Sequence, residues 1–325
     1  MQRAAKSRKK APSRRLASPA AKWRLRRASG LQILEAPPLA RLPWLIHGFS
    51  TRLGGTSALP PQSLQPRQNG RPASTKILNL GLTDWDTREN VAENRAAFAR
   101  ALGASKMCLV ALRQLHSDII QRIDANSSPT NGEPLQGDAL ITREKRILLA
   151  IQTADCVPIL LADTKHHAVA AVHAGWRGTV RRIAAKTLGR MQMQFGTQPR
   201  DVIAALGPGI GQCCYEVGAD VVKEFQAQFP AARDWFGGLF DALASNEDPN
   251  PLPWLTMRPP GHPAPEPRGQ LDLIAANRSI LVDAGVPPAK ITSSDFCTAC
   301  RTDLFFSYRR EPTTGRIMAV IGVLE

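Results

Sequence analysis

The stretch ILLAIQTADCVPILLADTKHHAVAAVHAGWRGT, residues 147–179, decides the fold class of this chain. It contains three short apolar runs, at 147–151, 157–162 and 168–172. Such runs are expected of strands that are buried on both faces. The residues that follow, 179–195, predict a helix, because their apolar side chains share one stripe and Gly196 stands where a helix commonly ends. Strands and helices therefore alternate within one short region.

Further elements lie on either side of this stretch. Apolar runs predict strands at 202–206 and 317–324. Helices are predicted at 87–102, with a cap at Asp86 or Thr87 and Gly103 after its end, and at 271–284. Because strands and helices are interspersed without regular βαβ units, a mixed-sheet α/β or α+β body is expected rather than a doubly wound one.

Two proline-rich segments and a basic arm divide the chain. Residues 1–30 are predicted to form a disordered basic N-terminal arm, although an organelle transit peptide has a similar composition. Residues 31–325 are predicted to form one compact domain with proline-rich insertions near 59–72 and 249–267. A division into two domains at the second insertion is the alternative.

The charge of the chain is concentrated in the arm. Of the net charge of +15, 11 Lys and Arg lie in residues 1–27, which contain no Asp or Glu, and the remainder holds 31 bases against 27 acids. A body-wide basic surface is therefore not expected, which argues against nucleic acid as a partner. No apolar window approaches the roughly 18 residues of a membrane span. Six cysteines among 325 residues indicate reduced thiols and a cytoplasmic protein.

Three residues at the ends of apolar runs suggest a metal site. They are His116 in QLHSD, Cys156 in TADCVP and His173 in AVHAGWRG. Imidazole and thiolate are ligands of zinc, and three protein ligands leave a fourth position open, as in catalytic zinc sites. Their separations match no local zinc signature, so three alternatives stand. The residues form part of the core, Cys156 is a nucleophile activated by a histidine, or the site binds copper.

The other cysteines offer a second, weaker candidate. Cys213 and Cys214 together with the CxxC of Cys297 and Cys300 suggest a four-thiolate structural zinc site. Adjacent cysteines are expected to be poorly placed as two ligands of one ion, and a single CxxC is equally a redox pair. The favoured interpretation of these four cysteines is that they are packing thiols.

Two arginines are candidates for binding an anion. Arg52 lies in the turn-forming segment STRLGG, and Arg177 in GWRGT lies just before the predicted helix. The planar guanidinium suits phosphate or carboxylate. A solvated surface arginine is the alternative for each. The segment GPGIG, 207–211, matches no phosphate-binding fingerprint and predicts a tight turn.

Taken together and in order, the motifs resemble those of a known family. They are HGFSTRLGG, QLHSD, GDALIT, TADCVPILLAD, AVHAGWRGT, GPGIGQCCYEVG, LDL with Asn277 and Arg278, CTAC, DLFFSYRR and TGR. The chain resembles the YfiH family over roughly residues 44–325, apart from the insertions. This family is also called the polyphenol oxidoreductase laccase-domain family, and its members are described as purine nucleoside phosphorylases.

The resemblance implies a fold, a metal site and an activity. It implies an α+β fold, a single-domain four-layer α/β/β/α sandwich with mixed sheets. It places a zinc site, with copper possible, at His116, Cys156 and His173. It implies a phosphorylase of the glycosyltransferase class that acts on adenosine, inosine and methylthioadenosine with phosphate, with adenosine deaminase side activity. The alternatives are a cysteine-dependent hydrolase or deamidase, a copper-linked polyphenol oxidoreductase and a non-enzymatic metal-storing or partner-binding protein.

For this reaction we expect three further catalytic residues. Arg52 and Arg177 would hold phosphate against the ribose, and Asp155 would act as an acid or base or orient a metal ligand. Asp155 at the end of a strand is equally a residue bonded to backbone. The expected partners are small-molecule purine nucleosides and phosphate, with no nucleic acid and no membrane, and the chain is expected to be a monomer or homodimer.

Overall fold

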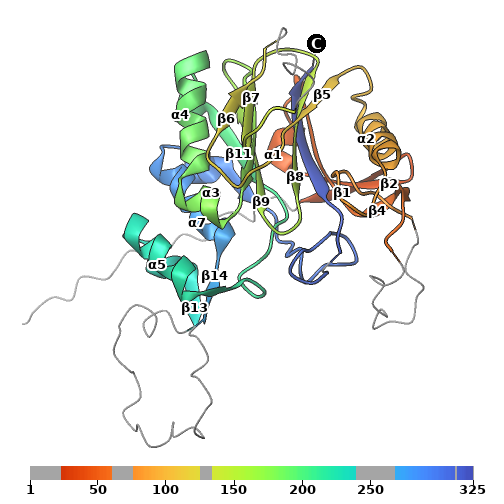
Figure 1. Ribbon diagram of the computed structural model, residues 1–325. Coiled ribbons are helices and arrows are strands. Elements are labelled where there is room, and N and C mark those ends of the chain that lie inside the picture. Colours follow the sequence, from red (N-terminus) through yellow and green to blue (C-terminus); the bar gives the residue numbers. More distant parts are fainter. Residues whose placement is uncertain (1–22, 61–75, 125–133, 239–267, 312, 325) are drawn as a thin grey trace, which may run out of the picture.

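Two six-stranded sheets pack face to face at the centre of the computed structural model (Figure 1). The structure describes residues 23–60, 76–124, 134–238, 268–311 and 313–324. The first sheet has the order β1-β2-β3-β16-β8-β5. The pair of β5 and β8 is parallel, and the other four pairs of neighbouring strands are antiparallel. Its strands are β1 (Arg24–Ala28), β2 (Leu31–Glu35), β3 (Leu45–Ser50), β16 (Ile317–Val323), β8 (Ile147–Thr153) and β5 (Cys108–Ala111).

The second sheet has the order β15-β11-β9-β10-β7-β6 and is also mixed. The pair β11 and β15 and the pair β6 and β7 are parallel, whereas β9 is antiparallel to both of its neighbours. The strands are β15 (Ile291–Ser293), β11 (Val202–Leu206), β9 (Val157–Asp163), β10 (Val169–Ala174), β7 (Ala139–Thr142) and β6 (Ile120–Arg122). Both sheets are mixed, as the sequence predicted.

Alternate residues of β8 explain why this strand is apolar at successive positions. Leu149 and Ile151 pack into the core between the sheets, with residues of β9 and β10. Leu148 and Ala150 point the other way, into a cluster that contains Phe98 of helix α2 (Arg88–Leu102). Because both faces of the sheet are covered, there is no solvent side on which polar residues would alternate.

Helices cover the outer face of each sheet and complete four layers (Figure 1). Helix α2 packs on the first sheet. Helices α4 (Ile183–Phe195) and α7 (Leu273–Asp283) pack on the second, where Leu188 and Ile280 join a cluster with Ile159 of β9. The predicted four-layer α/β/β/α arrangement is confirmed.

The two helices with clear capping residues follow the sequence prediction closely. The Thr87 hydroxyl accepts a hydrogen bond from the amide of Asn90, and Gly103 ends α2 with φ 81°. A side chain in place of the Gly103 hydrogen would strain this left-handed backbone. Asp272 caps α7 by accepting from the amide of Ala275 at 2.8 Å. The caps therefore fix these helix ends to within two residues of the prediction.

The helix predicted at 179–195 is wrong at its start. The structure has two helices, α3 (Trp176–Val180) and α4, with Arg182 between them at φ 58°. The guanidinium of Arg182 packs 4.4 Å from the ring centroid of Phe229 and donates to the carbonyl of Gln228 at 2.8 Å. These contacts with a distant segment hold the turn, and the stripe of apolar residues carries no sign of them.

The expected disordered arm ends earlier than residue 30. Residues 24–28 form β1, which pairs antiparallel with β2, and Arg26 donates to Glu35 at 2.6 Å. The backbone of this segment is thus satisfied by a neighbouring strand in spite of its charge. Residues 1–22, most of the insertion near 59–72 and all of the insertion at 249–267 lie outside the described residues.

A small third sheet, β12-β14-β13, lies beyond the second sheet. The remaining strands and α-helices are β12 (Glu216–Gly218), β13 (Phe236–Gly238), β14 (Arg268–Leu271), β4 (Leu53–Ser57), α1 (Pro37–Ala40) and α5 (Ala219–Gln228). Every helix in the described ranges is too short or too polar to span a bilayer.

Candidate functional site

The hairpin of β9 and β10 brings two of the three expected ligands together. Pro158 pairs with His173 and Val157 pairs with Ala174, so Cys156, one residue before β9, stands opposite Gly175. Side chains two residues apart along a strand share a face, which makes Cys156 and His173 diagonal neighbours. Their proximity follows directly from the register of the hairpin.

His116 joins them from the loop that follows β5. Its Nε2 lies 3.9 Å from the Sγ of Cys156, and its ring centroid lies 4.9 Å from that of His173. The ligand atoms of all three residues lie within 4.8 Å of one another. His116 has φ 56°, a conformation that a non-glycine residue adopts only where its surroundings hold it.

Asp138, fully buried at the start of β7, holds both histidines in place. Its Oδ1 accepts from the amide of His116 at 3.0 Å and from Nδ1 of His173 at 2.8 Å. Its Oδ2 accepts from the amides of Leu115 and Ser117 and from the Ser117 hydroxyl, at 3.1, 2.6 and 2.6 Å. Because a carboxylate only accepts here, Nδ1 of His173 carries the proton and Nε2 is the nitrogen available to a metal.

Cys156, His173 and Asp138 shift one another's pKa values. Burial opposes charge on Cys156, but the positive charge of His173 and a hydrogen bond with His116 outweigh it and lower the pKa of the thiol to about 6. Burial also opposes charge on His173, yet the Cys156 thiolate and Asp138 raise the pKa of the imidazole to about 9. Hydrogen bonds from His173 and Ser117 likewise outweigh burial and lower the pKa of Asp138 well below its usual range. Without a metal the group is therefore a thiolate–imidazolium pair.

Gly175 leaves the space that these ligands occupy. A Cβ atom at this position would lie 2.9 Å from Sγ of Cys156 and 3.2 Å from Cδ2 of His116. Two imidazole nitrogens and a thiolate facing one cradle form a donor set for a borderline-soft cation. The residues therefore fit a metal ion.

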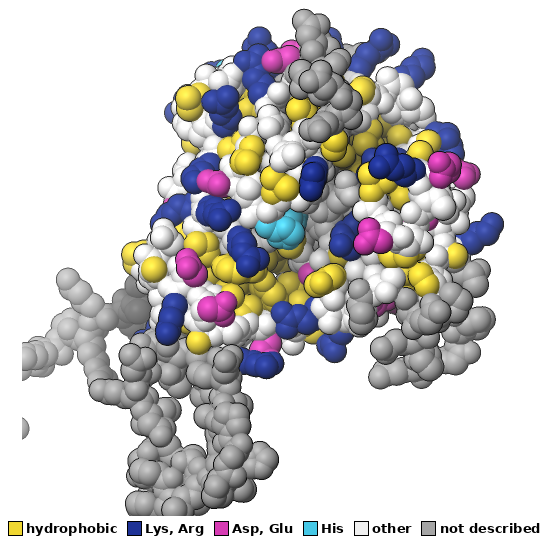
Figure 2. All heavy atoms as spheres, in the orientation of Figure 1, with side chains coloured by type: hydrophobic (Ala, Val, Ile, Leu, Met, Phe, Trp, Pro, Cys, Tyr) yellow, Lys and Arg dark blue, Asp and Glu magenta, His cyan; other side chains and the backbone are white. Residues whose placement is uncertain are grey.

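The three residues lie in a cavity of about 850 Å³. A volume of this size is within the range of small-molecule sites. Figure 2 shows a histidine side chain in the hollowed middle of this face, with Lys and Arg side chains around it. Leu82 and Tyr308 also line the cavity although they are 61% and 67% exposed, which leaves apolar surface at its mouth.

Positive charge predominates in the lining. Arg95, Arg113, Arg309 and Arg316 line the cavity, and Asp155 is the one carboxylate among its described lining residues. Burial lowers the pKa of Arg95 and of Arg316 below the usual arginine value. A cavity of this composition attracts anions.

Asp155 lines the cavity, but hydrogen bonds occupy both of its carboxylate oxygens. Oδ1 accepts from the Thr298 hydroxyl at 2.6 Å, and Oδ2 accepts from the amide of Arg309 at 2.7 Å. Its backbone has φ 90°, and its carbonyl accepts from the amide of Ile210 at 2.7 Å. Asp155 thus joins three wall segments, which favours the backbone-bonded interpretation over that of a free acid or base.

Arg52 is not placed as expected. It does not line the cavity; its side chain is buried in the core, where it donates to Glu311 at 2.7 Å and to the carbonyl of Thr302 at 2.8 Å. The hypothesis that Arg52 holds phosphate is therefore corrected: the turn STRLGG points the guanidinium inward, and a carboxylate already neutralises it.

Arg177 lies outside the cavity lining as well. It is exposed, and its guanidinium stacks 4.4 Å from the ring centroid of Trp176. Its charge nevertheless reaches Tyr215 in the cavity wall and acts to lower the pKa of that phenol. Its position is therefore beside the cavity rather than in it.

Sequence reasoning missed Asp138 and the four arginines of the lining. Asp138 stands directly before the buried run ALIT of β7, and a carboxylate at the end of a buried strand is a usable signal. The arginines lie in separate segments of the chain and no local pattern unites them. Only the fold brings them together.

The chain matches the family described as multi-copper polyphenol oxidoreductase laccase over residues 46–324. It is 38% identical over 298 residues to a purine nucleoside phosphorylase of Deinococcus radiodurans, covering 91% of this chain and 94% of that protein. It is 39% identical over 238 residues to adenosine deaminase RL5 of an unknown prokaryotic organism, covering 71% and 81%. The crystal structure of the hypothetical protein YfiH of Bacillus licheniformis superposes with a TM-score of 0.73 and 29% identity, covering 93% and 98%.

Proposed function

The chain belongs to the multi-copper polyphenol oxidoreductase laccase family, and we propose that within it the chain is a metal-dependent purine nucleoside phosphorylase. Its substrates are adenosine, inosine and methylthioadenosine together with phosphate. The name of the Deinococcus radiodurans relative supports this assignment. The observation that carries it is a single cavity that combines a His-Cys-His group with four arginines and one carboxylate.

We assign zinc to His116, Cys156 and His173. Copper is the alternative, and blue-copper sites commonly add an axial methionine. No methionine occurs among the described residues that line the cavity, which supports zinc. When bound, zinc would supply a Lewis acid in the cavity.

Phosphate binding is assigned to Arg113, Arg309 and Arg316 in place of Arg52. The side chain of Arg113 is exposed and makes no hydrogen bond or ion pair with the described residues, so its guanidinium is available for an anion. The Thr153 hydroxyl, 2% exposed in the lining, likewise has no hydrogen-bond partner in the described part of the chain. A buried hydroxyl without a partner is costly unless a ligand satisfies it.

The same cavity suits a purine and the charge that develops when the glycosidic bond breaks. Tyr308 and Leu82 give the base an apolar surface at the mouth, and the Gln152 amide offers both a donor and an acceptor to its edge. A phosphate oxygen bonds to C1′ of the ribose while the C1′–N9 electron pair leaves with the purine. Burial and the Cys156 charge raise the pKa of Tyr215 above its usual value, so its phenol stays protonated and can donate a hydrogen bond to the departing base.

Adenosine deamination is the second candidate function. It is favoured by the 39% identity to a protein named adenosine deaminase, and it would use the same cavity. Two further alternatives rest on the same residues, a cysteine-dependent hydrolase and a copper-linked polyphenol oxidoreductase. The thiolate–imidazolium pair of the metal-free group suits the hydrolase.

The test measures hypoxanthine released from inosine with and without phosphate, beside the metal content of the protein. We expect release only with phosphate, and in Cys156→Ser the loss of turnover together with the metal held by the His-Cys-His group. Cys108→Ser is the matched control, because Cys108 is exposed and lies outside the cavity lining. Metal loss with unchanged turnover in Cys156→Ser would contradict the catalytic metal. Activity that survives metal stripping but not alkylation would favour the hydrolase, and ammonia release from adenosine tests the deaminase.

A further inference from the structure

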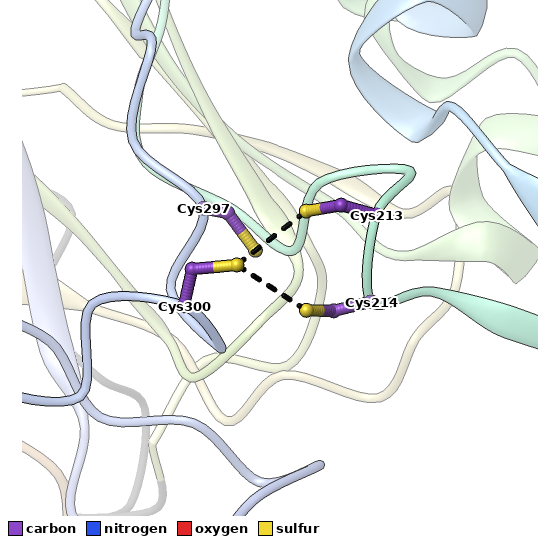
Figure 3. Close-up of side chains that lie close together, drawn as sticks. All are labelled: Cys213, Cys214, Cys297 and Cys300. Carbon is purple, nitrogen blue, oxygen red and sulfur yellow. Dashed lines mark hydrogen bonds between the residues drawn. The ribbon is translucent and has the colours of Figure 1, made fainter.

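The four cysteines of the weaker sequence candidate meet in space (Figure 3). Cys213 and Cys214 lie in the loop before β12, and Cys297 and Cys300 in the loop after β15. All four Sγ atoms lie within 4.8 Å of one another. The Sγ of Cys300 is 3.5 Å from that of Cys213 and 3.4 Å from that of Cys214. In Figure 3 the four sulfurs point toward a common centre.

These separations suit a tetrahedral ion. Metal–sulfur bonds of about 2.3 Å place neighbouring sulfurs roughly 3.8 Å apart. The separations of 3.5 and 3.4 Å at Cys300 are slightly shorter than that value, the others are at most 4.8 Å, and all four thiols are free. The expectation that adjacent Cys213 and Cys214 are poorly placed for one ion is therefore corrected: the turn at 211–215 aims both side chains at the same point.

The backbone around the cluster is shaped to it. Gly211 donates its amide to Sγ of Cys297 at 3.1 Å, and a Cβ at Gly211 would lie 3.1 Å from Cβ of Cys297 and 3.3 Å from Sγ of Cys213. Glycine at this position lets the amide approach the sulfur. The guanidinium of Arg310 lies 3.5 Å from Sγ of Cys214. Both donors favour negatively charged sulfur.

The cluster joins two segments of the cavity wall without lining the cavity itself. Gly209 bridges to Cys297, and the amide of Thr298 donates to the carbonyl of Gly209 at 3.0 Å. Residues next to the cluster face the cavity. Ile210 and Tyr215 of the first segment line it, and Thr298 of the second segment donates its hydroxyl to Asp155, which also lines it. A link between the segments would hold this part of the wall in place.

We propose that Cys213, Cys214, Cys297 and Cys300 bind one zinc ion as four thiolates, a structural site distinct from the His-Cys-His group. Four protein ligands leave no position open, so this ion has no role in the chemistry. Its role is positional: it fastens 209–215 to 297–300 behind the cavity wall.

The experiment counts zinc per full-length chain by plasma mass spectrometry after growth with zinc and purification under reducing conditions. We expect two equivalents in the wild type, one in Cys300→Ser and one in Cys156→Ser. The exposed Cys108→Ser variant, the matched control, keeps two. In the cobalt-substituted chain, thiolate-to-cobalt absorption should fall far more in Cys300→Ser than in Cys156→Ser, because only one ligand of the other site is a thiolate. Hydrogen exchange of 209–215 and 297–301 should become faster in Cys300→Ser.

The proposal would be overturned if the wild-type chain held only one zinc ion and Cys156→Ser held none. This outcome does not depend on whether Cys300→Ser folds. So would a Cys297–Cys300 disulfide found by alkylation of the denatured chain, which would make the CxxC a redox pair. A second equivalent that proves to be copper would overturn the assignment of zinc. The proposed phosphorylase stands or falls separately, because its test follows turnover and the metal at Cys156.

Discussion

Replacing Asp138 with asparagine tests whether one buried carboxylate organises the metal group. The carboxylate joins the loop that presents His116 to the imidazole of His173. Asp138→Asn keeps the size of the side chain but turns one acceptor into a donor. Whichever position the new NH₂ group takes, it faces groups that already donate.

The magnitude follows from the hydrogen bonds that are lost. An NH₂ group in place of Oδ1 faces two donors, the amide of His116 and Nδ1 of His173; in place of Oδ2 it faces three. The favoured orientation leaves at least two donors unsatisfied, at about 1–3 kcal/mol each. We expect the free energy of unfolding of the metal-free chain to fall by roughly 2–6 kcal/mol. Zinc affinity should fall about 10–100-fold, the usual effect of losing a residue that orients a metal ligand.

The assay is competition for zinc against a chelator, with urea unfolding of the metal-free chain beside it. Asp163→Asn is the matched control. Asp163 is also fully buried and accepts from a histidine, His166, at 2.9 Å and from backbone amides, but it lies at the opposite end of β9 from Cys156. It should lose stability and keep its zinc affinity. Unchanged zinc affinity in Asp138→Asn, or an equal loss in both variants, would refute the reasoning.

Four further predictions concern charge. Arg113→Ala should raise the phosphate KM by about 10-fold or more without lowering Tm, since one charge-assisted hydrogen bond contributes about 1.5–3 kcal/mol. Arg52→Ala should do the reverse and lower the free energy of unfolding by about 3 kcal/mol, since it leaves a buried ion pair broken; a raised phosphate KM in Arg52→Ala would restore its predicted role. Burial lowers the pKa of His47 to about 4. The unfolded chain therefore binds that proton more readily, and stability in urea should fall as the pH drops from about 6.5 through about 4, by up to roughly 3 kcal/mol, but not in His47→Gln. In the metal-free chain the alkylation rate of Cys156 should rise through about pH 6, and the midpoint should move upward in His173→Ala.

The parts of the fold that sequence predicted are those fixed by local chemistry. Helix α2 was predicted because Thr87 and Gly103 determine its two ends within the helix itself. The break at Arg182 was missed because it depends on Phe229 and Gln228, some 46 residues further along the chain. Strand β1 was missed for a similar reason, since pairing with β2 outweighs the charge that indicated a disordered arm.

The candidate metal ligands illustrate the same distinction. Cys156 and His173 lie across a hairpin, so their meeting could be inferred once β9 and β10 are paired. His116 comes from the loop that connects β5 of the first sheet to β6 of the second, and it is held by Asp138, a contact that spans 22 residues. The structure therefore supplies what spacing could not: the carboxylate that joins the two histidines.

The distribution of arginine shows why overall charge was a poor guide to binding. Outside residues 1–27 the chain has 31 bases and 27 acids, yet the cavity lining has four arginines and one carboxylate. Arg95 comes from α2, Arg113 from the loop after β5, and Arg309 and Arg316 from the segment before β16. Strands β5, β8 and β16 are neighbours in one sheet, so the segments at their ends meet around the cavity. A field that attracts an anion depends on charges that are close together in space rather than on their sum. Substitution of lining arginines should therefore weaken phosphate binding, whereas removal of residues 1–22, which carry 8 of the bases and precede β1, should leave nucleoside kinetics unchanged.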